Sequence, residues 1–210
     1  MKILQYLFIS LSHKILKLLP YTSIRILSVP IGTLYFLLTF RSSIKLFRRK
    51  EIFNELKINY KPLIVKINYT RYWLETLWLT NKNFSKYISP HVEIENLEYV
   101  EKLKKQYPGL IFALPHLGNW EFAIPIGNSI KLNLLAVAEP LNNSYVLNWF
   151  KSLRESLGIE IIIGGKGQNT FDLLVNKLKS GKDICLLSER SIKKSGVATI
   201  FFGQLAAFPK

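Results

Sequence analysis

The chain has 210 residues, of which 49% are hydrophobic and 13% aromatic, which excludes a disordered protein and allows one domain with a sizeable core. The formal net charge is +15, yet nine Lys or Arg and no acid fall in residues 1–50, a stretch that is also apolar. This combination indicates an anionic membrane surface as the partner and argues against nucleic acid.

The N-terminal segment has the pattern of an amphipathic surface helix. Residues 1–19 place apolar side chains at helical spacing and end at Pro20. A secretory signal would instead have a continuous apolar core and a small-residue cleavage site. The residues of this stripe are Ile3, Leu4, Leu7, Phe8, Leu11, Ile15, Leu18 and Leu19.

Residues 26–40 carry no charge, but Pro30 and Gly32 interrupt the run, which is shorter than the roughly 18–20 residues of a spanning helix. We expect a helix that dips into one leaflet or packs on the domain, with a true span as the alternative. Arg41, Lys45, Arg48 and Arg49 follow on one helical face. That face is either solvated or bound to lipid headgroups, where each residue contributes about 1 kcal/mol.

A further helix is expected over residues 61–80, with its aromatic stripe in the core. Residues 1–90 are therefore predicted to form a helical, membrane-associating region. From residue 91 to 210 the pattern changes to that of an α/β domain, because short apolar runs alternate with helical stretches. The expected strands are 110–114, 134–138, 159–163, 184–187 and 199–202, and the expected helices are 97–107, 120–129, 144–157 and 170–179. We expect a mostly parallel sheet flanked by helices, with the last two strands linked by a hairpin or an irregular crossing.

Active sites in such sheets lie at the carboxyl ends of the strands. His116 follows the first strand, Gly118 permits a tight approach, and Asn119 is suited to cap a helix. Glu121 is placed to curl back and hold the imidazole, so His116 can act as a general base toward a hydroxyl. His13 and His91 have no such setting and are expected to be bystanders.

Four further residues are candidates for the same site. Glu139 follows the second strand, where it can bind substrate hydroxyls or remain a solvated turn acid. Arg154 can bind a phosphate or lie at the surface. Glu189 and Arg190 follow the fourth strand, where they are either solvated or face a polar site. In such a site Glu189 can support the imidazolium or orient the acceptor, and Arg190 can hold an anionic headgroup or the phosphates of coenzyme A.

Two other features of the sequence do not indicate a functional site. Residues 164–167 lack the spacing of a nucleotide loop and indicate a flexible turn. The single Cys185 excludes internal disulfides and gives no metal-ligand spacing. We expect it to be a buried strand thiol, and we expect no metal and no bound cofactor.

The segment His116-Leu-Gly-Asn-Trp-Glu121 resembles the His-x4-Asp/Glu motif of glycerolipid-type acyltransferases. The chain is most similar to the branch of lipid A lauroyl/myristoyl acyltransferases and phosphatidylinositol mannoside acyltransferases, closest to the latter. The segments that carry the likeness besides the motif are 71–75, 138–141, 154–158, 187–190, 195–197 and 201–203.

The resemblance implies an α/β fold with N-terminal membrane-associating helices on the cytoplasmic face of the inner membrane, bound peripherally or monotopically. It implies a long-chain acyl-CoA or acyl carrier protein as donor and a glycolipid as acceptor. By matching position, His116 is the base and Glu121 its motif partner, and Glu139, Arg154 and Glu189 line the acceptor or donor site. Ser191 and Ala198 stand where the family has carboxylates, which leaves the acceptor sugar open.

Two alternatives stay open: a lipid A-type acyltransferase that uses acyl carrier protein, and a non-catalytic lipid-binding relative. Because residues 208–210 follow closely on a strand-like run, we also expect the chain to be the N-terminal part of a longer protein.

Overall fold

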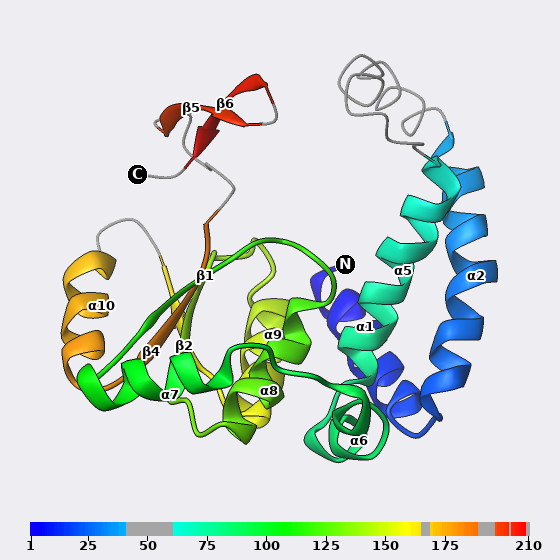
Figure 1. The fold of residues 1–210 in the computed structure, drawn as a ribbon. Coiled ribbons are helices and arrows are strands. Elements are labelled where there is room, and N and C mark those ends of the chain that lie inside the picture. The colour runs from blue at the N-terminus through cyan, green and yellow to red at the C-terminus, as the bar shows by residue number, and fades with distance from the viewer. Residues whose placement is uncertain (41–60, 165–168, 189–195, 202, 209–210) are drawn as a thin grey trace.

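The structure is a computed structural model that describes residues 1–40, 61–164, 169–188, 196–201 and 203–208. The expected basic face of Arg41, Lys45, Arg48 and Arg49 lies outside these residues. The described N-terminal half is helical, and the described C-terminal half contains a sheet with flanking helices (Figure 1). The predicted α/β class is therefore confirmed. The N-terminal elements are α1 (Lys2–Leu16), α2 (Tyr21–Leu38), α5 (Pro62–Trp78), α6 (Asn81–Tyr87) and the 3-10 helix η1 (Ser89–His91).

Helix α1 turns its apolar stripe outward and packs its other side against α5 and α9 (Ser144–Leu157). His13 belongs to the packed side, because its Nδ1 lies 2.7 Å from the carbonyl oxygen of Leu77 and its ring contacts Trp149 edge-on. Burial lowers the pKa of His13 despite that hydrogen bond, so the neutral ring donates from Nδ1. The large exposed side chains of this helix and the turn after it are Met1, Ile3, Leu4, Leu7, Phe8, Leu11, Ile15 and Leu18.

Helix α2 packs along α5, and the two form one side of the molecule (Figure 1). Its buried face is Ile24, Ser28 and Gly32, spaced four residues apart. At Gly32 an added Cβ would lie 2.6 Å from the Cα of Ile67, so the glycine permits the close approach of the two backbones. Small residues at such spacing are typical of tightly packed helices in membranes.

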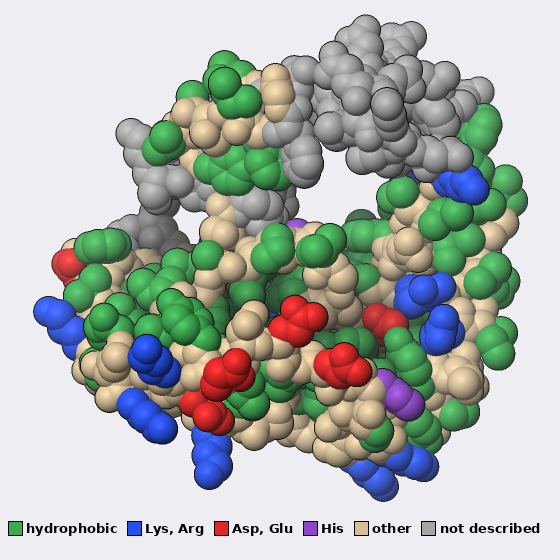
Figure 2. Space-filling model, viewed as in Figure 1, with side chains coloured by type: hydrophobic (Ala, Val, Ile, Leu, Met, Phe, Trp, Pro, Cys, Tyr) green, Lys and Arg blue, Asp and Glu red, His purple; other side chains and the backbone are tan. Residues whose placement is uncertain are grey.

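Pro30 lies inside α2 and does not break it, and the whole helix has 18 residues. Among the described residues, α2 is a helix long and apolar enough to cross a membrane, and 17% of it is buried. Hydrophobic side chains line its outer side (Figure 2). The helix is longer than the predicted segment because Tyr21 to Arg25 extend it at its start.

The central sheet is parallel, with strand order β1-β4-β2-β3. Its strands are β1 (Ile111–Leu114), β2 (Leu134–Ala138), β3 (Glu160–Ile163) and β4 (Asp183–Leu187), joined through η2 (Trp120–Phe122) with α8 (Ala123–Ser129), through α9, and through α10 (Thr170–Lys179). Helix α7 (Leu97–Gln106) precedes β1. Figure 1 shows α8 and α9 on one side of the strands and α10 on the other. Because all four strands are parallel, their carboxyl ends meet at one edge, as predicted.

The hydrophobic core lies between the sheet and the helices α6, α8 and α9. Helix α9 is capped at both ends as its sequence requires: the Asn143 side chain accepts from two amides at its start, and Gly158 takes a left-handed φ of 104° at its end. The buried members of this core are Leu79, Phe84, Ile124, Leu134, Leu157, Ile159 and Ile161.

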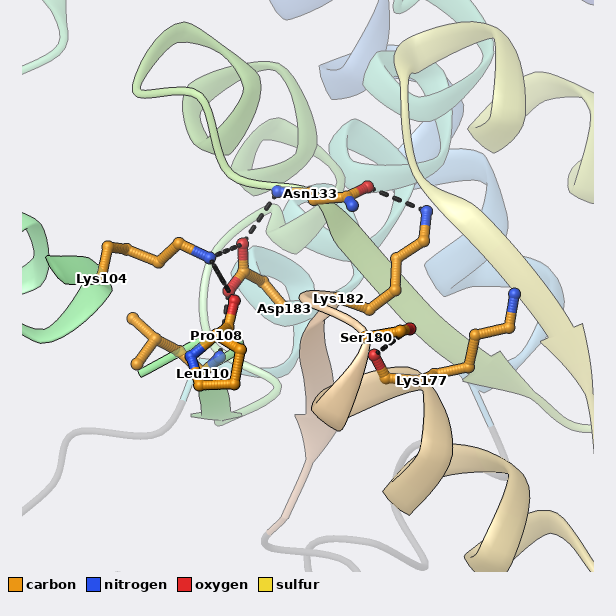
Figure 3. A network of polar contacts seen from close by, with 8 residues as sticks. All are labelled: Lys104, Pro108, Leu110, Asn133, Lys177, Ser180, Lys182 and Asp183. Carbon is orange, nitrogen blue, oxygen red and sulfur yellow. Dashed lines mark hydrogen bonds and ion pairs between the residues drawn. The ribbon is translucent and has the colours of Figure 1, made fainter. Parts of the chain in front are cut away.

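At the amino ends of the strands, Asp183 holds three elements together (Figure 3). Its carboxylate is fully buried and accepts from the amides of Leu110 and Asn133 at 3.0 and 2.8 Å and from Lys104 Nζ at 2.8 Å. These partners lie just before β1, just before β2, and on α7. A buried carboxylate is tolerated because each hydrogen bond to a charged group contributes about 1.5–3 kcal/mol.

The last two strands correct an expectation. Strand β5 (Val197–Phe201) pairs with β6 (Gln204–Phe208) in an antiparallel hairpin of its own, and not with β4. Of the two links that we expected between 184–187 and 199–202, the hairpin is therefore wrong, and the irregular crossing falls mostly on residues 189–195, outside the described residues. The pattern of apolar residues did not predict the pairing of β5 with β6, because the short apolar run of β6 is equally compatible with a loop.

Candidate active site

The loop after β1 carries the predicted motif. Gly118 has a φ of 64°, and an added Cβ would meet no atom within 4 Å. The glycine therefore supplies a left-handed backbone and not the tight approach that we expected. Asn119 is the cap of η2, as predicted, because its side chain accepts from the amide of Glu121 at 3.1 Å. The exposed His116 lies at this loop, with its ring against Trp120 at 6.2 Å between centroids.

Glu121 is 1% exposed and forms a two-pronged ion pair with Arg154 of α9. The guanidinium Nη2 lies 2.6 Å from Oε1, and Nε lies 3.1 Å from Oε2. This fork geometry fixes both side chains. The structure thus joins two predicted site residues to each other, while the contact of Glu121 with the imidazole stays a prediction.

Trp120 connects this ion pair with His116. The guanidinium carbon of Arg154 lies 5.0 Å from the centroid of the Trp120 ring, and the same ring contacts His116 edge-on. Burial acts to lower the pKa of Arg154, but the hydrogen bonds and charge of Glu121 outweigh it and raise that pKa overall. Burial, followed by the charge of Glu121, also raises the pKa of the neighbouring Tyr72. Arg154 is therefore a fixed positive charge, and Tyr72 a neutral phenol.

A cavity of about 1100 Å³ opens beside His116. Its lining comes from all four strands of the sheet and from α5, α8, α9 and the start of α10. The central strands β2 and β4 contribute small side chains to this lining, namely Ala136, Ala138 and Cys185, and their size leaves the space open. The larger apolar residues of the lining include Trp73, Leu114, Ile124, Leu134, Leu147, Phe150, Ile159, Ile161, Ile163 and Leu187.

Cys185 lies on this apolar lining, half-buried in the middle of β4. Burial, with a smaller effect from the charge of Asp183, raises the pKa of its thiol to about 11. The thiol stays protonated at neutral pH, so it is a poor nucleophile. The strand position of Cys185 is as expected, but its side chain is half-buried and not fully buried as we expected.

The charged and titratable side chains of the lining include His116, Glu139, Lys151 and Arg154. Glu139 is exposed directly after β2. Glu189 and Arg190 lie outside the described residues. The described part of the chain has no group of three or more His, Cys, Asp or Glu that could hold a metal ion.

Glu75 of α5 contacts the loop that carries His116, and sequence reasoning did not predict this contact. Its carboxylate is 5% exposed and accepts from the Asn119 side chain at 2.9 Å. Glu75 lies in the segment 71–75 that carries part of the family likeness and in the aromatic stripe of a helix, and neither signal indicates which loop the acid meets. His91, a predicted bystander, lies in η1 and outside the cavity lining.

Comparison with known proteins gives a consistent result. The profile of a family described as "Bacterial lipid A biosynthesis acyltransferase" matches residues 2–210. The phosphatidylinositol mannoside acyltransferase of Mycolicibacterium smegmatis is 30% identical over 146 residues, which are 68% of this chain and 47% of that protein. The protein of the same name from Mycobacterium tuberculosis is 30% identical over 145 residues, 68% of this chain and 46% of its own length. The chain thus spans about half the length of the curated relatives it matches.

Proposed function

The chain belongs to the bacterial lipid A biosynthesis acyltransferase family, and from this premise we propose that it moves a long acyl chain from acyl-CoA to a hydroxyl of a glycolipid like phosphatidylinositol mannoside. One observation carries the proposal: an apolar cavity of about 1100 Å³ opens beside a histidine at the carboxyl edge of the sheet. Ligand sites of small molecules have roughly 300–1,000 Å³, so this cavity is large enough for a long chain.

In the proposed reaction His116 accepts the proton of the acceptor hydroxyl as its oxygen attacks the thioester carbonyl. The tetrahedral intermediate collapses with cleavage of the C–S bond. The imidazolium then returns the proton to the departing coenzyme A thiolate, and an ester and free coenzyme A result. Amides of the Gly118–Asn119 turn, with Arg190, would stabilise the oxyanion.

We propose that Glu189 supports the imidazolium that forms when His116 takes a proton, because a carboxylate stabilises that charge. The register of the described strands supports this proposal. Leu114 of β1 is the register partner of Leu187 of β4, the amide of Ser188 donates to the carbonyl oxygen of Leu114 at 3.1 Å, and in sequence His116 and Glu189 each come two residues after this pair. Glu139, Arg154 and Arg190 are proposed to contact the acceptor or the phosphates of the donor.

The acyl chain would lie over Ala136, Ala138 and Cys185, whose small side chains leave the cavity open. Each buried methylene contributes about 0.8 kcal/mol to binding. An apolar cavity therefore selects a long chain by its burial and needs no polar contact along its length.

The outward apolar faces of α1 and α2 support docking on the cytoplasmic side of the inner membrane, where acyl-CoA is present. A helix with one apolar face lies in the interface with that face in the acyl region. We propose that α1 lies in the membrane surface, and that α2 dips into the same leaflet because its other face is packed on α5.

The test is release of free coenzyme A from palmitoyl-CoA by the full-length protein in the presence of membrane glycolipid, with His116→Ala beside it. His91→Ala is the matched control, because that histidine lies outside the cavity lining. We expect release that requires glycolipid, falls by at least about 10²-fold in His116→Ala, and is unchanged in His91→Ala. Near-normal release by His116→Ala would refute the mechanism.

Two other outcomes identify the alternatives. Transfer from palmitoyl acyl carrier protein, but not from palmitoyl-CoA, would assign the donor of the lipid A branch. Vesicle binding without turnover of either thioester would indicate a lipid-binding relative without activity.

A further inference from the structure

A buried hydrogen-bond chain connects the start of α2 with the loop that carries His116. The hydroxyl of Tyr21 donates to Oε1 of Glu75 at 2.8 Å, and the side-chain amide of Asn119 donates to Oε2 of Glu75 at 2.9 Å. Asn119 in turn accepts from the amide of Glu121 at 3.1 Å. The chain therefore runs from α2 through α5 to the end of the catalytic loop.

Chemistry fixes the direction of each bond. A carboxylate only accepts and a backbone amide only donates, so the NH₂ of Asn119 must face Glu75 and its oxygen must face Glu121. Both ends of the Asn119 amide are thereby occupied, which holds the side chain in one orientation. A cap held in this way fixes the first turn of η2, which contains Trp120 and Glu121.

Glu75 is 5% exposed and has no ion pair among the described residues. Its carboxylate instead accepts from two neutral donors, Tyr21 at the start of α2 and Asn119 in the loop after β1. A buried charge without an ion pair is costly unless hydrogen bonds compensate it. The burial of the Glu75 carboxylate therefore depends on these two hydrogen bonds. A second link reinforces them, because the Tyr72 and Trp120 rings lie 6.1 Å apart.

We propose that Glu75 is a positioning residue for the reaction: through Asn119 it fixes the loop from His116 to Glu121, and through Tyr21 it joins that loop to the start of α2. This rests on the proposed function, because the loop is catalytic only if the chain transfers acyl groups. The proposal further means that the packing of α2 on the domain determines the position of His116.

The first test compares Glu75→Leu, which removes both bonds at similar volume, with Glu75→Gln, which retains groups for both partners. We expect Glu75→Leu to lower kcat about 10–100-fold, since a displacement of about 1 Å costs this much. KM and the pH profile of kcat/KM should stay unchanged, and Glu75→Gln should recover most of the activity. If Glu75→Leu keeps wild-type kcat, or if Glu75→Gln is equally slow with a shifted pH profile, the positioning role is wrong.

Asn83→Ala controls for general loosening. Asn83 is buried and donates to the carbonyls of Lys17 and Trp78, so its loss weakens the same helical region without touching the loop. We expect Asn83→Ala to keep kcat near wild type. An equal fall in Asn83→Ala and Glu75→Leu would overturn the proposal.

Hydrogen exchange of the peptide over residues 115–122 tests the positioning without any turnover. We expect faster exchange in Glu75→Leu and in Asn119→Ala, no further increase in the double variant, and a smaller increase in Tyr21→Phe. Wild-type exchange in Glu75→Leu would overturn the link to the loop, and wild-type exchange in Tyr21→Phe would overturn the link to α2. A protein that transfers no acyl group would refute the proposed function and leave this readout intact.

Discussion

Arg154 has a structural contact in addition to the phosphate binding that its sequence position suggests. An arginine on a helix near a polar site is suited to bind phosphate, yet Nε and Nη2 of this one are both bonded to Glu121. The pair leaves a side-chain exposure of 18% for Arg154 and 2% for Glu121. Its first effect is to fasten η2 to α9.

We predict that Arg154→Met lowers the free energy of unfolding by about 3–5 kcal/mol, because it leaves the Glu121 carboxylate buried without its partner. The double variant Arg154→Met/Glu121→Leu should recover much of this loss, since no lone charge remains. Urea unfolding of the purified proteins measures both values. Equal losses in the single and double variants would contradict this account.

Lys151→Ala is the control, one turn earlier on the same helix. Lys151 and Glu155 are 39% and 43% exposed and lie 3.7 Å apart, so the change should cost less than about 1 kcal/mol.

At the scale of elements, the pairing of α2 with α5 depends on Gly32. We predict that Gly32→Leu separates the two helices and lowers the free energy of unfolding by about 1–3 kcal/mol, because the new side chain meets the backbone of Ile67. Thermal unfolding in mild detergent measures the change. Val29→Leu, at a side chain that is 47% exposed on the same helix, should leave stability unchanged. Equal effects of the two would show that the close approach is unimportant.

The elements themselves were predictable where periodicity and caps agree. The expected helices 144–157 and 170–179 and the strand 134–138 match α9, α10 and β2 in both bounds, since Asn143, Gly158 and Asn169 mark their ends. The pairings were not predictable. Glu75 meets partners 54 and 44 residues away, and the period of a helix reports which face is buried but not what covers it. The sequence predicted His116, Glu121 and Arg154 as site residues, but it did not predict the ion pair between Glu121 and Arg154.

At the scale of the molecule, the exposed apolar face of α1 is predicted to bind lipid. Phe8→Glu/Leu11→Glu should weaken binding to vesicles of phosphatidylglycerol and phosphatidylethanolamine by at least about tenfold, because two side chains lose apolar burial. Vesicle flotation measures the bound fraction. Tyr99→Glu on α7, at a side chain that is 60% exposed, is the control. Equal losses in both variants would show that charge alone, and not this face, governs binding.

The position of Asp183 has a consequence for how such a protein can change. Its carboxylate ties the sheet together at the amino edge of the strands (Figure 3), whereas His116 and Glu139 follow the opposite edge. The Asp183 network and the predicted site residues thus lie at opposite ends of the same strands. The loop after β2 can therefore vary in sequence without loss of the contacts that fasten the amino edge of the sheet.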